Sequence, residues 1–454
     1  MELLQIQPLS ALGHDDSGHD STGLNWAKKI SLAAFGLGLL LLLVCATGVA
    51  KSNPVLFLLL SFGSMSAGAV AYFIVESKEA PPGIKNNHIF TNAMTARGAI
   101  AWVTGIFITG FYIILYWTPG LLENWMRLVD PLSFLIVGQP ADQWFLYGTF
   151  YTLAILVMGL RMILVKYRHS NYHIVRTLSI MFFQLGFAFL IPYLLKRLNQ
   201  PDFYFSYFWP LKYNYLFPND VHALVSHPGR LGVFMVFWGA MMTFIATPIL
   251  TYFFGKRWYC SWVCGCGGLA NTLGDPWRHL SDKSLGAWKI ERWMIHSVLV
   301  FITVTTALLW INSTSGGHIL GSLSNSLGKT YGFLIGAVFS GVIGVGFYPI
   351  MGARVWCRFG CPMAATLGIL QKYFSRFRIT TNGGQCMSCG NCSTYCEMGI
   401  DVRSYAERGQ NIIRASCVGC GICSSVCPRG VLKLENGPRK GRYNFTIDDA
   451  LIEH

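Results

Sequence analysis

Residues 386–397 read CMSCGNCSTYCE, and residues 417–428 read CVGCGICSSVCP. Both stretches place four cysteines at the spacing C-x2-C-x2-C-x3-C, which is typical of ligands for a four-iron, four-sulfur cluster. Structural zinc is the alternative for closely spaced cysteines, but zinc sites do not repeat an eight-cysteine pattern in this order. The two stretches therefore predict a pair of [4Fe–4S] clusters.

The spacing also predicts which cysteines share a cluster. The fourth cysteine of each stretch lies too far along the chain to bind the same cluster as the first three, so it is expected to bind the other cluster. The predicted ligand sets are Cys386, Cys389, Cys392 and Cys427 for the first cluster, and Cys417, Cys420, Cys423 and Cys396 for the second. Gly390 and Gly421 are expected to let the backbone bend tightly around the sulfides. Pro428 follows the last ligand of the second stretch, whereas the first stretch has Glu397, which predicts a looser turn or an altered cluster potential.

Residues 380–435 resemble the two-cluster bacterial ferredoxins. The resemblance implies a small α+β domain with pseudo-twofold symmetry. It also implies one-electron transfer without substrate chemistry of its own.

The rest of the chain has the composition of a membrane protein. Of its 454 residues, 53% are hydrophobic and only 12% are charged, against about 25% charged in soluble proteins. Eight segments are apolar over about the 20 residues that a helix needs to cross a bilayer. They are Ile30–Ala50, Pro54–Val75, Gly98–Trp117, Trp144–Val165, Thr177–Leu195, Leu231–Gly255, Trp293–Ile311 and Tyr331–Met351. The predicted fold is an all-α polytopic membrane bundle followed by the small α+β domain.

The distribution of Lys and Arg predicts the orientation. The connectors assigned to one side carry twice as many basic residues as those on the other side, and everything after Met351 adds to the richer side. Because basic residues gather in the cytoplasm, both termini and the ferredoxin domain are predicted there, in a bacterial cytoplasmic membrane. The same asymmetry accounts for the net charge of +14 without nucleic acid. The predicted units are a polar tail (1–29), the membrane domain (30–355), a thiol motif with a linker helix (356–379), the ferredoxin domain (380–435) and a C-terminal tail (436–454).

Two further stretches repeat a pair of thiols. Residues 255–264 read GKRWYCSWVC, and residues 352–361 read GARVWCRFGC, each after an apolar run. Residues four apart on a helix share one face, so each pair is expected to present two sulfurs to one centre. The predicted shared centre consists of Cys260, Cys264, Cys357 and Cys361. Four thiolates suit an iron–sulfur cluster or Cu(I); the alternative is that these cysteines only pack beneath the ferredoxin domain.

Residues close to the two thiol pairs could influence the predicted centre. Arg257 and Arg354 precede the pairs and are expected to lower the pKa values of nearby thiols. Cys266 could serve as an alternate ligand. His169 and His173, in a basic connector, are predicted to be solvated.

CSWVC and CRFGCP, followed by two ferredoxin motifs, are similar to the membrane polyferredoxins of the NapH and NosR type over residues 230–435. Those proteins are associated with periplasmic nitrate and nitrous-oxide reductases. The cytochrome-oxidase assembly protein CcoG, linked to copper reduction, has a related layout. The first pair lacks the family's proline, with Gly265 where Pro362 stands in the second. The chain has neither an S-G-A-T-like flavin stretch, as the NosR branch would have, nor a β-domain after the clusters, as the CcoG branch would have, so the resemblance implies a NapH-like role.

Three functions follow from these observations. The first is electron transfer between a cytoplasmic or quinol donor and a partner respiratory redox complex, as a subunit rather than a stand-alone enzyme. A bilayer of about 30 Å is too wide for one hop, so a quinone or a partner's cofactor would have to carry electrons across. The aromatic connector 201–218 could be a quinone pocket or a docking surface, but an interfacial aromatic belt is the favoured interpretation. The second function is that of a copper reductase or metal-handling assembly factor for a respiratory oxidase, and the third is a scaffold with structural clusters.

Overall fold

The computed structural model describes residues 21–79, 95–382 and 384–436. Eight helical segments in these residues are long and apolar enough to cross a membrane. These segments are Asn25–Cys45, Pro54–Lys78, Ala99–Trp117, Gln143–Lys166, Asn171–Arg197, Leu231–Phe254, Leu285–Thr314 and Ser322–Ile343. All eight predicted spans are confirmed. The last one lies earlier than predicted, because the chain turns at residues 344–347.

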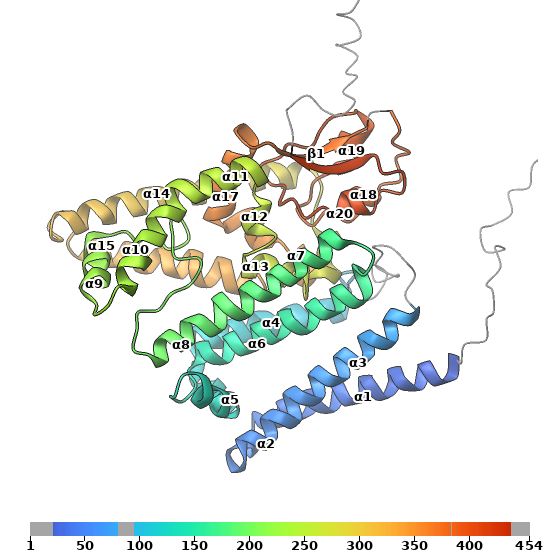
Figure 1. Cartoon of the computed structure of the whole chain (residues 1–454), viewed down its shortest axis with the longest axis horizontal. Coiled ribbons are helices and arrows are strands. Elements are labelled where there is room, and N and C mark those ends of the chain that lie inside the picture. Colours follow the sequence, from blue (N-terminus) through green and yellow to red (C-terminus); the bar gives the residue numbers. More distant parts are fainter. Residues whose placement is uncertain (1–20, 80–94, 383, 437–454) are drawn as a thin grey trace, which may run out of the picture.

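The first half of the bundle comprises α1 to α8, shown from blue to green in Figure 1. Their bounds are α1 (Ser21–Cys45), α2 (Pro54–Leu58), α3 (Ser64–Glu79), α4 (Ala99–Trp117), α5 (Glu123–Ile136), α6 (Gln143–Arg161), α7 (Asn171–Phe182) and α8 (Ile191–Arg197). Short π-helical segments join α2 to α3 and α7 to α8 into continuous spans. The predicted tails 1–29 and 436–454 lie largely outside the described residues, and α1 begins nine residues before the predicted span.

The second half carries the remaining spans and the short helices of the thiol motifs. The bounds are α9 (Pro218–Ser226), α10 (Leu231–Met241), α11 (Thr247–Phe254), α12 (Arg257–Cys260), α13 (Gly265–Asn271), α14 (Leu285–Thr314), α15 (Ser322–Tyr331), α16 (Tyr348–Met351) and α17 (Pro362–Tyr373). A π-helical segment, Gly332–Ile343, continues α15 and completes the eighth span.

The C-terminal domain is built around a two-stranded antiparallel sheet. Strand β1 (Phe377–Thr381) pairs with β2 (Leu432–Asn436), with Ile379 opposite Leu434. Between them lie the short helices α18 (Asn391–Thr394), α19 (Val402–Glu407) and α20 (Ile422–Ser425). Helices α18 and α20 begin after Gly390 and Gly421, whose φ angles of 77° and 78° are left-handed. The equivalent turns in the two cysteine stretches agree with the pseudo-symmetric α+β fold that the ferredoxin resemblance implies.

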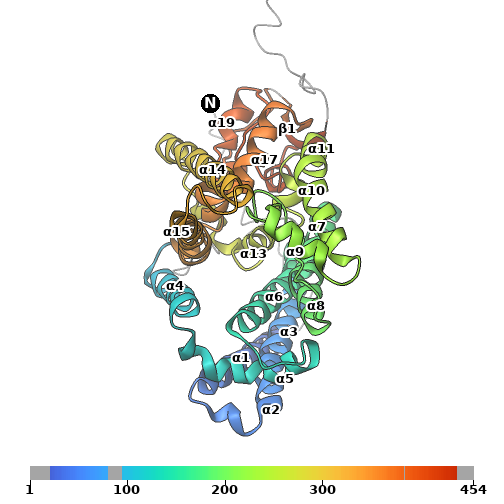
Figure 2. The same cartoon turned by 90° about the vertical axis from the view of Figure 1, so that its left-hand side faces the viewer.

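This domain lies at one end of α7, α11 and α17, on the far side of the bundle from α1 and α3 (Figures 1 and 2). One buried core runs from the membrane domain into it, and includes Phe208, Cys260, Leu367, Phe377 and Ile400. The two parts are thus packed together rather than tethered by a linker.

The aromatic connector before α9 folds inward. Phe203, Phe208, Tyr215 and Phe217 are buried, and the Phe208 ring lies 5.9 Å from the Tyr259 ring, next to the first thiol pair. These four rings pack inside the protein, so the interpretation of the connector as an interfacial belt is wrong for them.

Candidate metal centre

Two cavities in the C-terminal domain are each lined by four cysteines. The first cavity is lined by Cys386, Cys389, Cys392 and Cys427. The second is lined by Cys396, Cys417, Cys420 and Cys423. The structure therefore brings together the two sets that the sequence spacing predicts, with the fourth cysteine of each stretch at the other stretch's cavity.

The walls of these cavities suit an iron–sulfur cluster. Ile379, Met398 and Val418 line the second cavity, and Val431 and Leu432 line the first. Cysteine thiols are the usual ligands of iron–sulfur clusters, and apolar walls limit solvent access to a cluster. That iron binds to these eight residues stays a prediction.

The two thiol pairs share one local structure. Gly255 and Gly352 end the preceding helices with left-handed φ angles of 64° and 92°. Cys264 and Cys361 then occupy the N-cap positions of α13 and α17, with the Cys361 sulfur 3.4 Å from the backbone N–H nitrogen of Ala364. The prediction that each pair lies on one face of one helix is wrong: a turn at residues 261–263 separates Cys260 from Cys264, and Cys361 lies just after the π-helical segment Trp356–Gly360 that contains Cys357. The two stretches nevertheless repeat in structure as well as in sequence, because each has a glycine of positive φ before the pair and a cysteine at a helix N-cap.

The four paired thiols meet beneath the ferredoxin domain. Cys260, Cys357 and Cys361 are buried in the same core, and Cys264 packs against it. Across the described parts of the chain, no three His, Cys, Asp or Glu side chains are arranged to hold a single metal ion. The cluster alternative is compatible with this wider spacing, because each thiolate of a cluster binds a different iron.

Burial raises the pKa of three of these thiols, Cys260, Cys357 and Cys361, whereas a hydrogen bond with Cys266 lowers the pKa of Cys264. Burial raises the pKa of Cys260 to about 12 and also raises the pKa of Cys357, although Lys256 and Arg354 oppose the shift. Arg354 lowers the pKa of both thiols, as expected, but burial outweighs this effect. Arg257 does not contribute, because its guanidinium lies over the Phe377 ring at 4.9 Å and bonds to Asn436. Lys256, the residue before Arg257, is the basic residue of the first stretch that lowers the pKa of these thiols.

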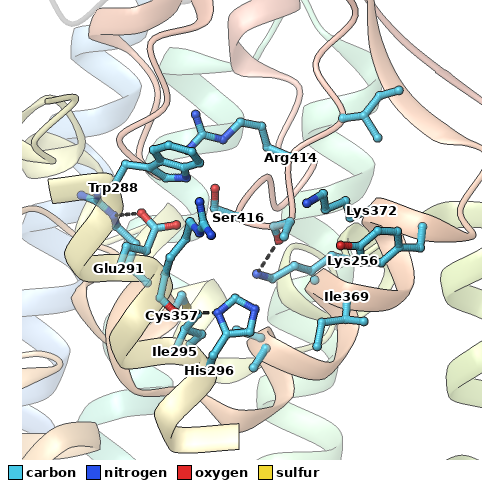
Figure 3. Close-up of a pocket in the computed structure, with 18 of the residues that line it drawn as sticks. Lys256, Trp288, Glu291, Ile295, His296, Cys357, Ile369, Lys372, Arg414 and Ser416 are labelled. Atoms are coloured by element: carbon cyan, nitrogen blue, oxygen red, sulfur yellow. Dashed lines mark hydrogen bonds and ion pairs between the residues drawn. The ribbon is translucent and has the colours of Figure 1, made fainter. Parts of the chain in front are cut away.

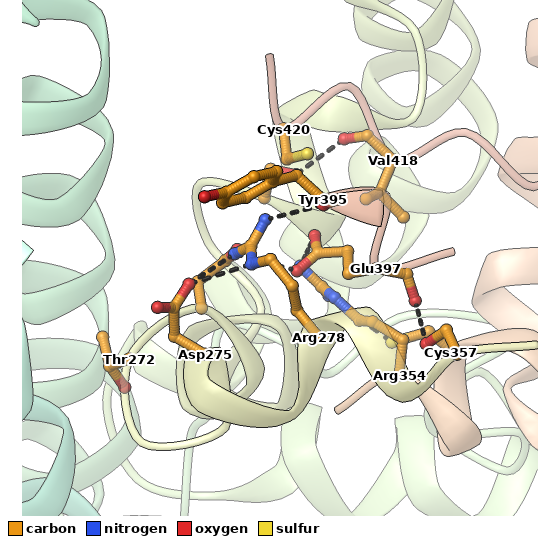
Figure 4. A network of polar contacts seen from close by, with 12 residues as sticks. Thr272, Asp275, Arg278, Arg354, Cys357, Tyr395, Glu397, Val418 and Cys420 are labelled. Carbon is orange, nitrogen blue, oxygen red and sulfur yellow. Dashed lines mark hydrogen bonds and ion pairs between the residues drawn. The ribbon is translucent and has the colours of Figure 1, made fainter. Parts of the chain in front are cut away.

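Glu397, which stands where the second cysteine stretch has Pro428, forms buried ion pairs with the membrane domain. Glu397 is fully buried and pairs with Arg354 at 2.9 Å and with Arg278 at 3.4 Å (Figure 4). Burial alone would raise the pKa of Glu397, but the two guanidinium groups hold it below its usual value. Arg354 also lies 3.6 Å from the Cys357 sulfur and donates to the Cys260 carbonyl. Glu397 follows the predicted ligand Cys396, so this network joins the second cavity to the thiol pairs.

Further contacts hold the domain in place. Arg278 pairs with Asp275 at 2.9 Å, and Asp275 also pairs with Lys166, which extends the buried network into the bundle. Ser261 donates to the Val418 carbonyl at 2.6 Å, and Gln371 donates to the Cys417 carbonyl at 2.8 Å. These bonds reach the loop that carries three predicted ligands of the second cluster.

His173 is not solvated, contrary to the sequence-based prediction. It is 1% exposed and lies between the stacked ring of Tyr167 and Gly421 of the cluster loop. Its neighbour Arg176, also buried, donates to the Cys420 carbonyl at 2.7 Å. Sequence patterns could not show this, because the contact joins residues more than 240 positions apart.

Two family models match the chain. A 4Fe-4S dicluster domain matches residues 385–432, and a 4Fe-4S binding domain matches residues 236–286 and 332–381. The second family's two matches contain both thiol pairs.

Two curated relatives match part of the chain. One, from Escherichia coli (strain K12), bears the name "Putative electron transport protein YccM" and is 26% identical over 36% of this chain and 47% of its own length. The other, "Uncharacterized protein MJ0749" from Methanocaldococcus jannaschii, is 27% identical over 34% of this chain and 56% of its own. The chain thus spans about half the length of these relatives. No solved structure matches. Together with the eight spans, the matches indicate iron–sulfur electron transfer in a membrane protein.

Proposed function

We propose that this chain transfers electrons between a cytoplasmic or quinol donor and a partner respiratory redox complex. Two [4Fe–4S] clusters, held by the crossed cysteine sets, would supply one-electron chemistry. A third centre, held by the two thiol pairs, would lie between them and the membrane helices. The likeness to NapH-type proteins supports this role.

The observation that carries the proposal is the continuity from the cysteine cavities to the thiol pairs. The second cavity borders the membrane domain through Cys396, and the adjacent Glu397 contacts Arg354, which contacts Cys357. Buried ion pairs and hydrogen bonds hold such a junction together. The chain's own residues therefore link the second cavity to the thiol pairs.

Copper handling is the second candidate. It is disfavoured by the absence, in the parts of the chain that the structure describes, of three ligand side chains arranged for one ion. A Cu(I) site needs its soft ligands around a single metal, so the thiol pairs would have to rearrange to form one.

The acceptor beyond the third centre is proposed to be a quinone or a cofactor of the partner complex. The first thiol pair closely follows the end of the sixth span, so a lipid-soluble carrier at that end would lie near the buried thiols without touching them. The orientation with the ferredoxin domain in the cytoplasm follows from the basic residues and is part of this proposal.

The test measures electron delivery in the full chain. Protein in nanodiscs would be reduced anaerobically with dithionite and mixed with duroquinone, and the return of cluster absorbance would be followed. We expect rapid reoxidation for the natural sequence and reoxidation at least tenfold slower for Cys260→Ser/Cys264→Ser. Cys45→Ser, which removes a buried thiol of α1 away from the site, is the matched control. Equal rates for all three proteins would refute a path through the thiol pairs.

A further inference from the structure

A cavity of about 380 Å³ lies where the membrane helices meet the ferredoxin domain (Figure 3). Its walls come from α14, from α17 and from residues 413–416 of the ferredoxin domain. Lys256 and Cys357, from the two thiol stretches, also line it. The cavity is separate from the two cysteine cavities.

The side chains that line this cavity are strongly basic. The basic residues are Lys256, Arg292, His296, Arg358, Lys372 and Arg414. Glu291 is the one acidic residue of the lining, and it is neutralised by Arg358, whose Nε lies 3.0 Å from its carboxylate. Within residues 21–79, 95–382 and 384–436, no carboxylate forms an ion pair with any of the other lysines and arginines of the lining.

Lys256 is the most deeply buried of these unpaired basic side chains. Its residue is 2% exposed, and its ammonium group donates to the Ala415 carbonyl at 3.3 Å. A buried charge without a carboxylate partner is unfavourable. An anion in the cavity would compensate it.

The arginines are held in position by one ring. The guanidinium groups of Arg292 and Arg414 both lie over the Trp288 ring, at 5.0 Å and 4.7 Å from its centroid. Such cation–π contacts orient a guanidinium group without neutralising it. Both groups therefore stay available to an anion.

One side of the cavity is suited to lipid. Ile295 and Ile369 contribute an apolar wall. Trp293 and Phe374 lie close by in sequence and are 78% and 63% exposed. Exposed aromatic rings at the end of a membrane span are typical of the headgroup level of a bilayer.

We propose that this cavity binds a phosphate group, that of an anionic phospholipid or of free phosphate. Arg and Lys side chains recognise phosphate oxygens through charge-assisted hydrogen bonds. Basic pockets between membrane helices are typical sites for anionic headgroups. The bound phosphate bridges α14 and α17 to residues 413–416, so it stabilises the junction between the two domains. The proposal does not depend on the identity of the electron acceptor.

The test compares three nanodisc preparations of the full chain. One contains phosphatidylcholine alone, one adds phosphatidylglycerol, and one contains phosphatidylcholine with inorganic phosphate in the buffer. The unfolding midpoint and the phospholipid retained in native mass spectrometry are measured for each. The variant is Arg292→Gln/Lys372→Gln, which changes two exposed residues of the lining. Lys289→Gln is the control, because Lys289 is exposed on the same helix but does not line the cavity.

We expect phosphatidylglycerol to raise the midpoint of the natural sequence and of Lys289→Gln by several degrees. The double variant should lose more than half of this shift and retain at least tenfold less phosphatidylglycerol. An equal shift with inorganic phosphate alone would support the site with free phosphate as its ligand. An equal response of the double variant and the natural sequence, or no response to either probe, would overturn the proposal.

Discussion

Glu397 and Arg354 form a fully buried ion pair, 2.9 Å apart, between the ferredoxin domain and the second thiol stretch. A carboxylate at this depth needs two partners, and Arg278 supplies the second at 3.4 Å. Glu397, which stands where the second stretch has Pro428, is therefore a contact of the first stretch with the membrane domain, beside Tyr395, whose carbonyl accepts from Arg278. The difference is explained by docking rather than by a looser turn.

Replacing Glu397 should weaken this junction strongly. Glu397→Gln leaves two buried arginines without their carboxylate, and breaking a buried ion pair costs about 3–5 kcal/mol. Glu407→Gln is the control, because its pair with Arg403 is exposed at 3.6 Å and is expected to contribute less than about 1 kcal/mol. Thermal unfolding of both variants in detergent checks this. A midpoint for Glu397→Gln as high as that of the control would contradict a docking role.

Crossed ligation predicts which cluster each cysteine serves. Cys396→Ser should perturb the electron paramagnetic resonance signal of the cluster held by Cys417, Cys420 and Cys423, because these four line one cavity. Adding Cys417→Ser should then cause little further loss, since both changes act on one cluster, whereas adding Cys386→Ser should remove the other signal. If Cys396→Ser and Cys386→Ser instead affect the same signal, the crossed assignment is wrong.

The shared third centre predicts non-additive losses of iron. If the thiol pairs hold one [4Fe–4S] cluster, the chain contains about twelve irons instead of about eight. Cys260→Ser/Cys264→Ser should remove about four, and adding Cys357→Ser and Cys361→Ser should remove no more. Iron and acid-labile sulfide analysis of anaerobically purified protein checks this. Unchanged contents in the fourfold variant would show that the pairs are packing residues.

Lys256 should tune the potential of the neighbouring centres. Its charge lies near Cys260, Cys357 and Cys417, where it opposes the rise of their pKa values. A positive charge favours the reduced, more negative state, so Lys256→Gln should lower the midpoint potential by tens of millivolts; about 59 mV corresponds to about 1.4 kcal/mol for one electron. A redox titration followed by electron paramagnetic resonance measures the shift. Lys289→Gln, on the surface of α14, should leave the potential unchanged, and equal potentials in both variants would speak against this role.

The proposed orientation places the connectors near Lys51, Arg127 and Lys212, and the connector 315–321 before the eighth span, outside the cytoplasm. Reporter fusions at these connectors should be active in the periplasm, and a fusion after Glu435 should be active only in the cytoplasm. Periplasmic activity of the last fusion would reverse the orientation and, with it, the side of the clusters.

The sequence by itself determined the eight spans and the grouping of the eight ferredoxin cysteines. Both depend on short-range regularities: the length of an apolar run, and the spacing of thiols within a dozen residues. It also predicted that Cys260, Cys264, Cys357 and Cys361 meet, because a repeated motif implies a repeated environment. It could not predict that the second cysteine of each pair lies outside the helix that carries the first.

Only the tertiary structure decided the partners of the charged residues. Glu397 meets Arg354 and Arg278, which lie 43 and 119 positions earlier in the chain. The packing also buries His173, turns Arg257 away from the thiols and puts Lys256 beside them. A charge is attracted to any opposite charge, and nothing in its local sequence selects the partner. The choice is made when separate helices pack and the cost of desolvation leaves one paired arrangement stable.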